Sequence, residues 1–148
     1  FFLNHEGEED AELIDRVNSA LNSPILVVTE PNPLAVKGII GVSRAVLSSR
    51  YHGCISAMSQ GIPCIGTSWS HKYELLFRQY QACELLLEPT ITVETLRAVI
   101  DLSLETDSNI SESIAAEALA LKAKSTAMWD DFKSVVERYP VFRGKRQE

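Results

Sequence analysis

The sequence predicts an α/β domain of the Rossmann-like type, in which helices flank a mostly parallel sheet of about five strands. Two observations predict it. Short apolar runs of four or five residues recur along the chain, and amphipathic stretches with apolar residues at helical spacing lie between them. The chain has 148 residues, which is enough to bury a core of its own. We expect residues 1–138 to form this domain and residues 139–148 to be a loose tail.

The amino-terminal part of the chain contains three expected strands with two helices between them. Acidic residues open the first helix, where the helix dipole favours them, and its apolar residues lie on one face. The second strand is apolar throughout, as in a strand that is buried on both faces. Pro31 and Pro33 break the chain before a short helix that Gly41 ends. The expected elements are the strand Phe1–Asn4, the helix Glu8–Leu21, the strand Ile25–Val28, the helix Leu34–Ile40 and the strand Ala45–Ser48.

The remaining part of the chain continues the alternation. Gly61 is expected to cap the helix that follows the third strand. The last two helices have apolar residues spaced along one face, and we expect the final one to pack back on the domain or to lie against a missing neighbour. The expected elements are a helix from the turn 50–53 to about Gln60, the strand Pro63–Gly66, the helix Lys72–Tyr80, the strand Cys83–Leu87, the helix Thr92–Glu105 and a helix from Ser111 to about Arg138.

Composition and charge argue against two classes of protein. The chain carries 20 acidic and 14 basic residues, a formal net charge of −6, whereas general nucleic-acid binding usually needs a basic face. No apolar run approaches the ~20 residues that a membrane span requires. No basic segment followed by an apolar one marks a secretory leader. We therefore expect no nucleic-acid partner and no membrane span.

The cysteines and the first residues give two further expectations. Cys54, Cys64 and Cys83 lie in apolar stretches and form no CxxC pair, which is typical of small core residues in a reducing cytoplasm. The chain begins with the apolar run 1–3, which has the composition of a buried strand. A domain that begins inside a strand is expected to be part of a longer chain.

Three polar loops follow strands of the predicted sheet. They are Asn4–Gly7, Ser49–Gly53 and Thr67–Lys72, and each contains one histidine. Because the carboxyl ends of parallel strands meet at one edge of a sheet, where ligands bind in such folds, we expect these loops to lie together. The histidines are His5, His52 and His71.

Arg50 and His52 are the strongest candidates for binding and catalysis. If the strand extends through them, side chains two residues apart point the same way, toward a ligand at the amino end of the next helix. The planar guanidinium group of Arg50 matches a carboxylate or a phosphate, and the imidazole of His52 can donate or accept a proton near neutral pH. Gly53 would let the backbone approach the ligand closely. A structural arginine and a capped loop histidine are the alternative reading.

The third loop contributes further candidates. Lys72 opens a helix, where the dipole disfavours a cation and a ligand anion would compensate. Trp69 is placed to stack on a substrate ring or to cover the sheet edge. His5 and Lys72 are read, alternatively, as surface polar residues, and Tyr51 is expected to be a packing residue. No metal-ligand spacing, Walker loop, GxGxxG or GxSxG motif is present, so no metal or cofactor is expected.

Several segments together carry a combination of motifs. The matching residues are Ser49-Arg50-Tyr51-His52-Gly53, then the stretch 57–66 with Gly61-Ile62-Pro63-Cys64-Ile65, then Trp69-Ser70-His71-Lys72, and earlier His5, Asp10 and Leu13. These resemble the polysaccharide pyruvyl transferase family, which shows R-x-H after a strand, a small-residue helix, G-x-P-x-I and an aromatic before a lysine. The resemblance covers about residues 1–105 and is strongest over 45–80. Ser70-His71 stand where the family often has Asp-Pro.

The resemblance implies a two-lobed enzyme with a glycosyltransferase-B-like architecture, of which this chain is the second lobe. An amino-terminal lobe, missing here, would supply the other wall of the cleft. The implied reaction transfers the enolpyruvyl unit of phosphoenolpyruvate onto two hydroxyls of a sugar or polysaccharide, which forms a pyruvate ketal and releases phosphate. The implied location is the cytoplasm, with contact to the membrane through the acceptor.

The resemblance also implies roles for individual residues. His52 would be the general acid, and His5 would assist it or take the proton of the sugar hydroxyl. Arg50 would pair with the carboxylate or phosphate of the donor, and Lys72 would share the charge of the departing phosphate. The other substrate-binding residues would be Gly53, Ser68 and Trp69.

Two other functions fit the same fold. The first is the nucleotide-sugar-binding lobe of a glycosyltransferase or epimerase, which usually keeps an acidic residue for the ribose after the fourth strand. Glu74 is the candidate for that residue. The second is a non-catalytic binding domain with the same fold. Titration with phosphoenolpyruvate and with nucleotide sugars distinguishes the three.

Overall fold

The computed structural model describes residues 1–5, 7–67, 70–105 and 109–139. Strands and helices alternate along this part of the chain, and every strand pairing in it is parallel. The predicted α/β class is therefore confirmed. The elements are β1 (Phe2–Asn4), α1 (Glu8–Ser19), β2 (Val27–Thr29), α2 (Pro33–Gly41), β3 (Val46–Ser48), α3 (Tyr51–Met58), β4 (Cys64–Thr67), α4 (His71–Gln79), the 3-10 helix η1 (Cys83–Leu85), β5 (Leu86–Leu87), α5 (Val93–Leu104) and α6 (Asn109–Arg138).

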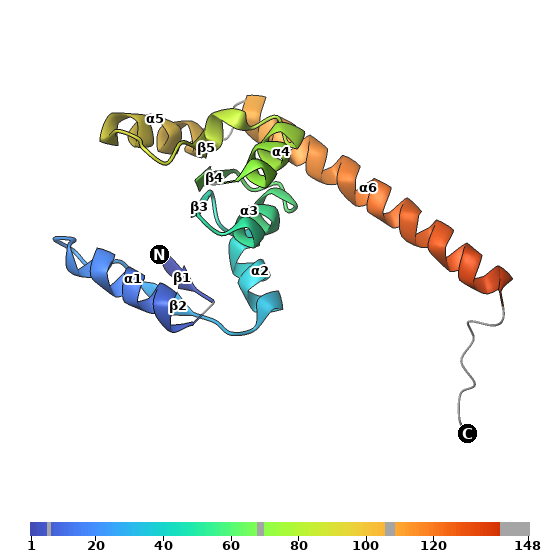
Figure 1. Cartoon of the computed structure of the whole chain (residues 1–148), viewed down its shortest axis with the longest axis horizontal. Coiled ribbons are helices and arrows are strands. Elements are labelled where there is room, and N and C mark those ends of the chain that lie inside the picture. Colours follow the sequence, from blue (N-terminus) through green and yellow to red (C-terminus); the bar gives the residue numbers. More distant parts are fainter. Residues whose placement is uncertain (6, 68–69, 106–108, 140–148) are drawn as a thin grey trace, which may run out of the picture.

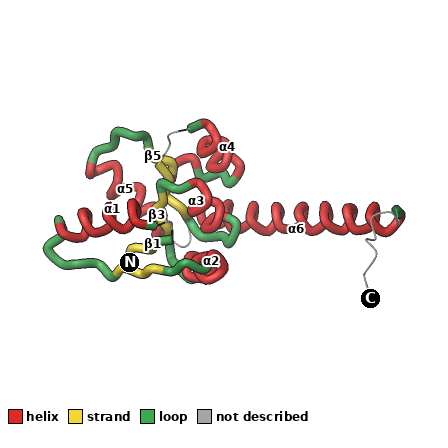
Figure 2. The backbone as a smooth tube through the Cα atoms, turned by 60° about the horizontal axis from the view of Figure 1, so that its bottom comes forward, coloured by secondary structure: helices red, strands yellow, loops and turns green. Residues whose placement is uncertain are grey.

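The strands form two small sheets, so the prediction of one sheet of about five strands is wrong in this respect. β1 pairs with β2, and β3, β4 and β5 form a second sheet in that order. Figure 1 shows the β1–α1–β2 unit beside the body formed by α2 to β5, and Figure 2 shows the same strands in a second view. Strands of two to four residues provide few ladder hydrogen bonds, and the apolar core gathers around only one of the two sheets.

The core surrounds β4. Its residues Cys64, Ile65 and Gly66 are buried, and α3, α4 and the beginning of α6 pack around them. Burial of apolar side chains here is the main source of stability. The largest fully buried side chains are Tyr73, Phe77, Met58, Leu85, Ile114, Cys54 and Cys64.

The thiols are distributed between core and surface. Cys54 and Cys64 are free and buried, as predicted for small core residues. Cys83 is free but exposed, so the prediction is wrong for this residue. The reason is local: Cys83 begins η1, and Leu85 at its end takes the buried position. The predicted strand Cys83–Leu87 is accordingly shortened to β5.

Gly66 lies in the most crowded part of the core. A Cβ atom at this position would lie 2.5 Å from the Cζ of Phe77, a fully buried side chain. We expect Gly66→Ala to lower the free energy of unfolding by ~1–3 kcal/mol because the packed ring has to move. Urea unfolding of the two proteins measures this, and Gly38→Ala is the control, since its added Cβ would meet nothing within 4 Å. Equal midpoints for wild type and Gly66→Ala would contradict the packing described here.

The β1–α1–β2 unit buries much less than its sequence predicts. No residue of α1 is buried, and Leu13 and Val17 on its predicted apolar face are 55% and 42% exposed. The middle residue of β2 is half-buried and its neighbours are exposed, so β2 is not the doubly covered strand that its composition predicts. An amphipathic pattern shows which face prefers burial, but not whether the described part of the chain covers it.

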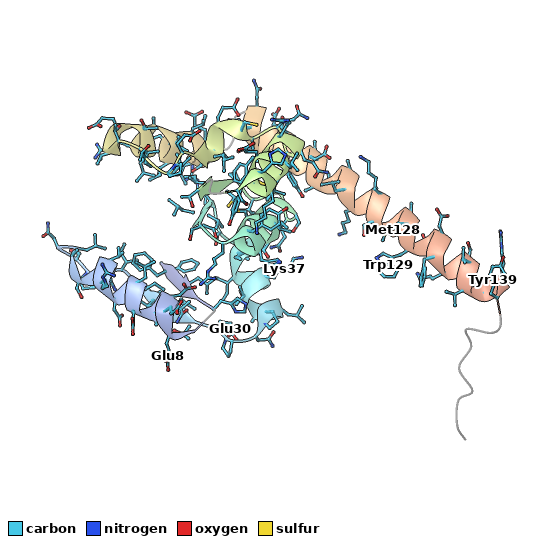
Figure 3. All side chains as sticks on the ribbon, viewed as in Figure 1. Glu8, Glu30, Lys37, Met128, Trp129 and Tyr139 are labelled. Carbon is cyan, nitrogen blue, oxygen red and sulfur yellow. The ribbon has the colours of Figure 1, made fainter. Side chains whose placement is uncertain are left out.

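The last helix, α6, packs against the body only near its beginning. Ile114 and Ala118 are buried in the core. The helix then extends away from the body, and Met128 and Trp129 on its outer part are exposed (Figure 3). The prediction that the whole helix packs back on the domain is therefore wrong. None of the described helices is both long enough and apolar enough to cross a membrane.

Candidate functional site

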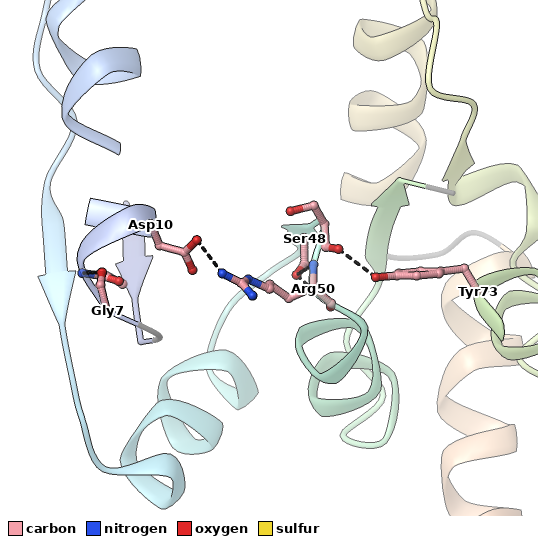
Figure 4. A network of polar contacts seen from close by, with 7 residues as sticks. Gly7, Asp10, Ser48, Arg50 and Tyr73 are labelled. Carbon is pink, nitrogen blue, oxygen red and sulfur yellow. Dashed lines mark hydrogen bonds and ion pairs between the residues drawn. The ribbon is translucent and has the colours of Figure 1, made fainter. Parts of the chain in front are cut away.

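Three of the predicted site residues, Arg50, His52 and Gly53, lie at the amino end of α3. Ser48 of β3 is level with Gly66 of β4, so these two strands end side by side. Arg50 follows β3, and Lys72 lies in the first turn of α4. An ion pair joins this group to the amino-terminal unit: the Arg50 Nη2 is 2.7 Å from the Oδ1 of Asp10, on α1 (Figure 4). The structure thus brings polar residues after β1, β3 and β4 toward one region.

A serine turn fixes the backbone of Arg50. The Arg50 N–H donates to the Ser48 Oγ, and the Ser48 hydroxyl donates to the Arg50 carbonyl oxygen, both at 3.1 Å. Arg50 has an extended backbone and is the residue before α3. Its side chain is 51% exposed and Asp10 is 30% exposed. A pair this exposed contributes ~1 kcal/mol or less, so a ligand anion can compete with Asp10 for the guanidinium.

His52 reaches this region by a different route from the predicted one. The third strand ends at Ser48 and the helix α3 begins at Tyr51, so the predicted extension of the strand through Arg50 and His52 is wrong. The rule that residues two apart point the same way in a strand does not apply across a helix start. His52 lies in the first turn of α3, is exposed, and has its ring 6.2 Å from that of Tyr51. That both side chains face one ligand remains a prediction.

Gly53 is explained by the same serine turn. A Cβ atom on Gly53 would collide with the Ser48 Oγ. The absence of a side chain therefore lets Ser48 hold both backbone groups of Arg50. Gly53 lies within α3, and its approach to a ligand remains a prediction.

Lys72 has an aromatic partner that the sequence analysis did not foresee. Its Nζ lies 4.7 Å from the ring centroid of Tyr51 and 5.7 Å from that of Tyr73. The two rings meet edge to face at 5.3 Å. Cation–π attraction helps to hold the ammonium at a helix amino end, where the helix dipole disfavours it. The prediction of a packing role for Tyr51 is confirmed, because this residue packs against the core.

Tyr73 connects the α4 region to the arginine loop. Its ring is fully buried and its hydroxyl donates to the Ser49 carbonyl oxygen at 2.8 Å. This bond fixes the residue before Arg50 from the neighbouring helix. Sequence reasoning missed Tyr73, although a tyrosine directly after the candidate Lys72 was a usable signal, since a buried tyrosine hydroxyl usually finds a partner.

The other two histidines make local contacts. The His5 Nδ1 is 3.3 Å from the Glu30 carbonyl oxygen, so His5 lies where the loops after β1 and β2 meet. The His71 Nδ1 is 3.1 Å from the Glu74 Oε2, and both side chains are exposed on α4. Ser68 and Trp69, which the sequence predicts to bind substrate, lie outside the described residues.

Two buried polar atoms near these loops have no hydrogen-bond partner within the described part of the chain. They are the Asn4 Oδ1 and the Ser70 Oγ. Asn4 ends β1 and is 7% exposed, and Ser70 directly precedes α4. A buried oxygen without a partner costs ~1–3 kcal/mol. Asn4 belongs to the first of the three predicted loops, and Ser70 to the third.

Two thiols lie behind the arginine loop. The Cys54 Sγ donates to the Ser48 carbonyl oxygen at 3.7 Å. A hydrogen bond from Cys64 lowers the pKa of Cys54, and the same bond together with burial raises the pKa of Cys64 well above its usual value. The pair is part of the packing beneath Ser48. In the described ranges, no group of three or more His, Cys, Asp or Glu side chains is arranged to hold a metal ion.

A cavity of about 420 Å³ lies elsewhere, at the amino ends of β3 and β4. Its lining includes Arg44, Pro63 and Ser103, and Arg44 donates to the Leu104 carbonyl oxygen at 2.8 Å. In parallel sheets ligands bind at the carboxyl ends of the strands. The candidate site is therefore the region around Arg50, and this cavity is separate from it.

Comparison with known proteins gives a family match over the amino-terminal part of the chain. Residues 1–71 match the family model of polysaccharide pyruvyl transferase, which confirms the resemblance. The matched segment contains His5, Asp10, Arg50 and His52 and ends directly before Lys72. No curated protein and no solved structure gives a match.

Proposed function

We propose, from the match of residues 1–71 to polysaccharide pyruvyl transferases, that this chain provides one side of the active site for pyruvyl transfer to a sugar. The donor would be phosphoenolpyruvate, and the acceptor would be a sugar of a polysaccharide or glycan. The observation that carries the proposal is the position of Arg50 and His52, which stand at the amino end of α3 inside the matched segment.

The donor is a compact anion with a carboxylate and a phosphate. No side chain of the described residues caps the first N–H groups of α3, and Arg50 adds a guanidinium directly before them. A planar fork of N–H donors fits either anionic group of the donor. Asp10 holds the fork in place by the 2.7 Å contact and can be displaced because the pair is half exposed. Asp10 is therefore a positioning residue for Arg50.

The reaction requires a proton at the CH2 carbon of the donor. Protonation of the CH2 group by His52 would make it a methyl group and leave an oxocarbenium-like carbon. One sugar hydroxyl then adds to that carbon. A second hydroxyl replaces the phosphate, as the bond between that carbon and the phosphate oxygen breaks, and the ketal forms. The two hydroxyls lose two protons, of which one balances the proton given to the CH2 group and the other leaves with the phosphate. His5, near the end of β2, would accept the first of these protons.

Lys72 would balance the charge of the departing phosphate. Tyr51 and Tyr73 hold its ammonium beside the arginine loop, within 5.7 Å of both ring centroids. Ser68 and Trp69 precede it in the chain and would contact the substrate, as the resemblance implies. Gly53 keeps the loop close enough to Ser48 for Arg50 to be held.

The remaining parts of the proposal follow from the family. A glycosyltransferase-B-like architecture would place an amino-terminal lobe opposite this region, and that lobe would bind much of the acceptor. Phosphoenolpyruvate is itself the donor substrate, so the proposed reaction uses no cofactor. The enzyme would act in the cytoplasm, where phosphoenolpyruvate is formed, and near the membrane where its acceptor is attached.

The nucleotide-sugar alternative depends on Glu74 as the ribose ligand. That carboxylate is in contact with His71 on α4, at 3.1 Å. Side-by-side titrations of the full-length protein with phosphoenolpyruvate and with nucleotide sugars test the choice. Saturable binding of phosphoenolpyruvate alone supports pyruvyl transfer, and saturable binding of a nucleotide sugar alone supports the alternative. Binding of neither would favour the non-catalytic domain.

A further inference from the structure

The outer part of α6 presents an apolar stripe that the described part of the chain leaves uncovered. Met128, Trp129, Phe132 and Val135 are between 48% and 56% exposed. The rings of Trp129 and Phe132 meet edge to face at 5.7 Å, so the stripe contains a preformed aromatic pair. A contiguous exposed patch of large apolar side chains is typical of an interaction surface.

The stripe continues the pattern that buries the beginning of the helix. Without Trp129, which lies beside it, this line of positions alternates at intervals of four and three residues, which is the spacing of a coiled-coil seam. The first of these positions face the core of this chain, and the later ones extend along the projecting helix (Figures 1 and 3). The seam consists of Ile114, Ala118, Leu121, Ser125, Met128, Phe132 and Val135.

We propose that the outer part of α6 pairs with the same helix of a second copy of this chain, in antiparallel orientation. The register that fits places Leu121 of one copy against Phe132 of the other, and Ser125 against Met128. Each layer then sets a small or medium side chain against a larger one, which suits interdigitated packing. The antiparallel arrangement also keeps the two bodies at opposite ends of the paired helices.

Charges beside the seam favour this register. In it, Lys124 of each copy lies beside Asp131 of the other, which gives two pairs of opposite sign. On the other flank, Lys122 lies beside Trp129, where an ammonium and an indole attract. All four positions are on the exposed part of α6. Flanking charges of this kind select the partner and its orientation in helix pairs.

Other arrangements of the same two helices lack this complementarity. A shift by seven residues sets Asp131 against Asp131 and Lys124 against Arg138, so that like charges meet. A parallel pair brings Lys124 beside Trp129 and Asp131 beside Val136, and the opposite charges that it brings together are Glu117 and Lys122, where the helix still packs on the body of its own chain. Cross-seam repulsion of like charges disfavours the shifted register. The antiparallel pairing of Lys124 with Asp131 is thus the arrangement that the sequence of α6 supports.

Sedimentation of the full-length protein over a range of concentrations tests the proposal. We expect a reversible dimer in the wild type and a monomer for Phe132→Asp. Leu119→Asp is the matched control, because Leu119 is 70% exposed on α6 but lies outside the seam, and it should dimerise like the wild type. The proposal is overturned if the wild type is monomeric at every concentration, as it would be if another part of the full-length chain covered the stripe. It is also overturned if the Phe132→Asp variant still dimerises.

A charge exchange tests the register. Lys124→Asp sets two pairs of like charges together, and we expect it to weaken the dimer by about tenfold. Combining it with Asp131→Lys restores opposite signs in both pairs and should restore the dimer. Dimerisation that Lys124→Asp weakens and the second change does not restore would overturn the antiparallel register. None of these residues belongs to the proposed active site, so a dimer defect leaves pyruvyl transfer testable by itself.

Discussion

Replacing His52 with glutamine is expected to reduce turnover by ~100-fold or more while phosphoenolpyruvate still binds. Glutamine keeps a similar size and a hydrogen-bond donor, but it cannot deliver a proton at neutral pH. His52 is exposed in the first turn of α3, so the substitution leaves the packing of the core unchanged. Steady-state turnover and donor affinity, measured separately in the full-length enzyme, distinguish a lost acid from a lost binding contact.

The matched control for this change is His71→Gln. His71 is also an exposed histidine in the first turn of a helix, and its Nδ1 lies 3.1 Å from the Glu74 Oε2. It should keep turnover close to that of the wild type. If His52→Gln turns over at a rate near that of the wild type, His52 is not the general acid, and His5 becomes the candidate for that role.

The second large effect is expected from Arg50→Lys, which should weaken phosphoenolpyruvate binding first. Lysine keeps the charge but loses the planar fork. A charge-assisted bond in a cleft contributes ~1.5–3 kcal/mol, or roughly ten- to a hundred-fold in affinity. Calorimetric titration with phosphoenolpyruvate measures the change. Arg16→Lys is the control, because Arg16 is exposed in the last turn of α1 and should leave the affinity as it is.

The role of Asp10 separates two explanations of an Arg50 effect. If Asp10 only holds the guanidinium, Asp10→Asn should leave the donor affinity within a few-fold of the wild type, since the fork remains available to the ligand. If the Arg50–Asp10 pair mainly joins the amino-terminal unit to the body, both substitutions should lower the unfolding midpoint together. An unchanged affinity in Arg50→Lys would show that Arg50 is structural and that the anion binds elsewhere.

Much of the fold could be predicted from the sequence because local patterns determine it. The apolar runs became strands, and the amphipathic stretches between them became helices, with parallel pairing throughout the described residues. Gly61, in the turn that follows α3, has a positive φ of 77°, as predicted for a helix-terminating glycine. These features depend on residues that are close together in the sequence, so one sequence is enough to predict them.

The division of the sheet could not be predicted in the same way. The apolar face of α1 has the same pattern whether or not another element covers it, and here Leu13 and Val17 remain exposed. The seam of α6 likewise predicts burial along its whole length, although only Ile114, Ala118 and their neighbours meet the body. Periodicity indicates that a face needs a partner and does not identify that partner.

The structure brings several of the predicted site residues near one another, but their local geometry differs from the predicted one. The Ser48 hydroxyl ends the strand early by bonding both backbone groups of Arg50, a contact between residues two apart that the apolar pattern does not reveal. Asp10 and Tyr73 contact the arginine loop from elements that are distant in sequence. Such contacts depend on how the elements pack together.

The most direct test of the proposed function follows the labelled donor carbon to its product. Phosphoenolpyruvate labelled with a heavy carbon isotope at the enol position is incubated with the full-length protein and a panel of glycans, and the products are examined by NMR. The account predicts that, with a competent glycan, the label moves from the enol position to a ketal carbon, that phosphate appears in equal amount, and that His52→Gln suppresses both. Consumption of a nucleotide sugar while phosphoenolpyruvate stays intact with every acceptor would contradict it.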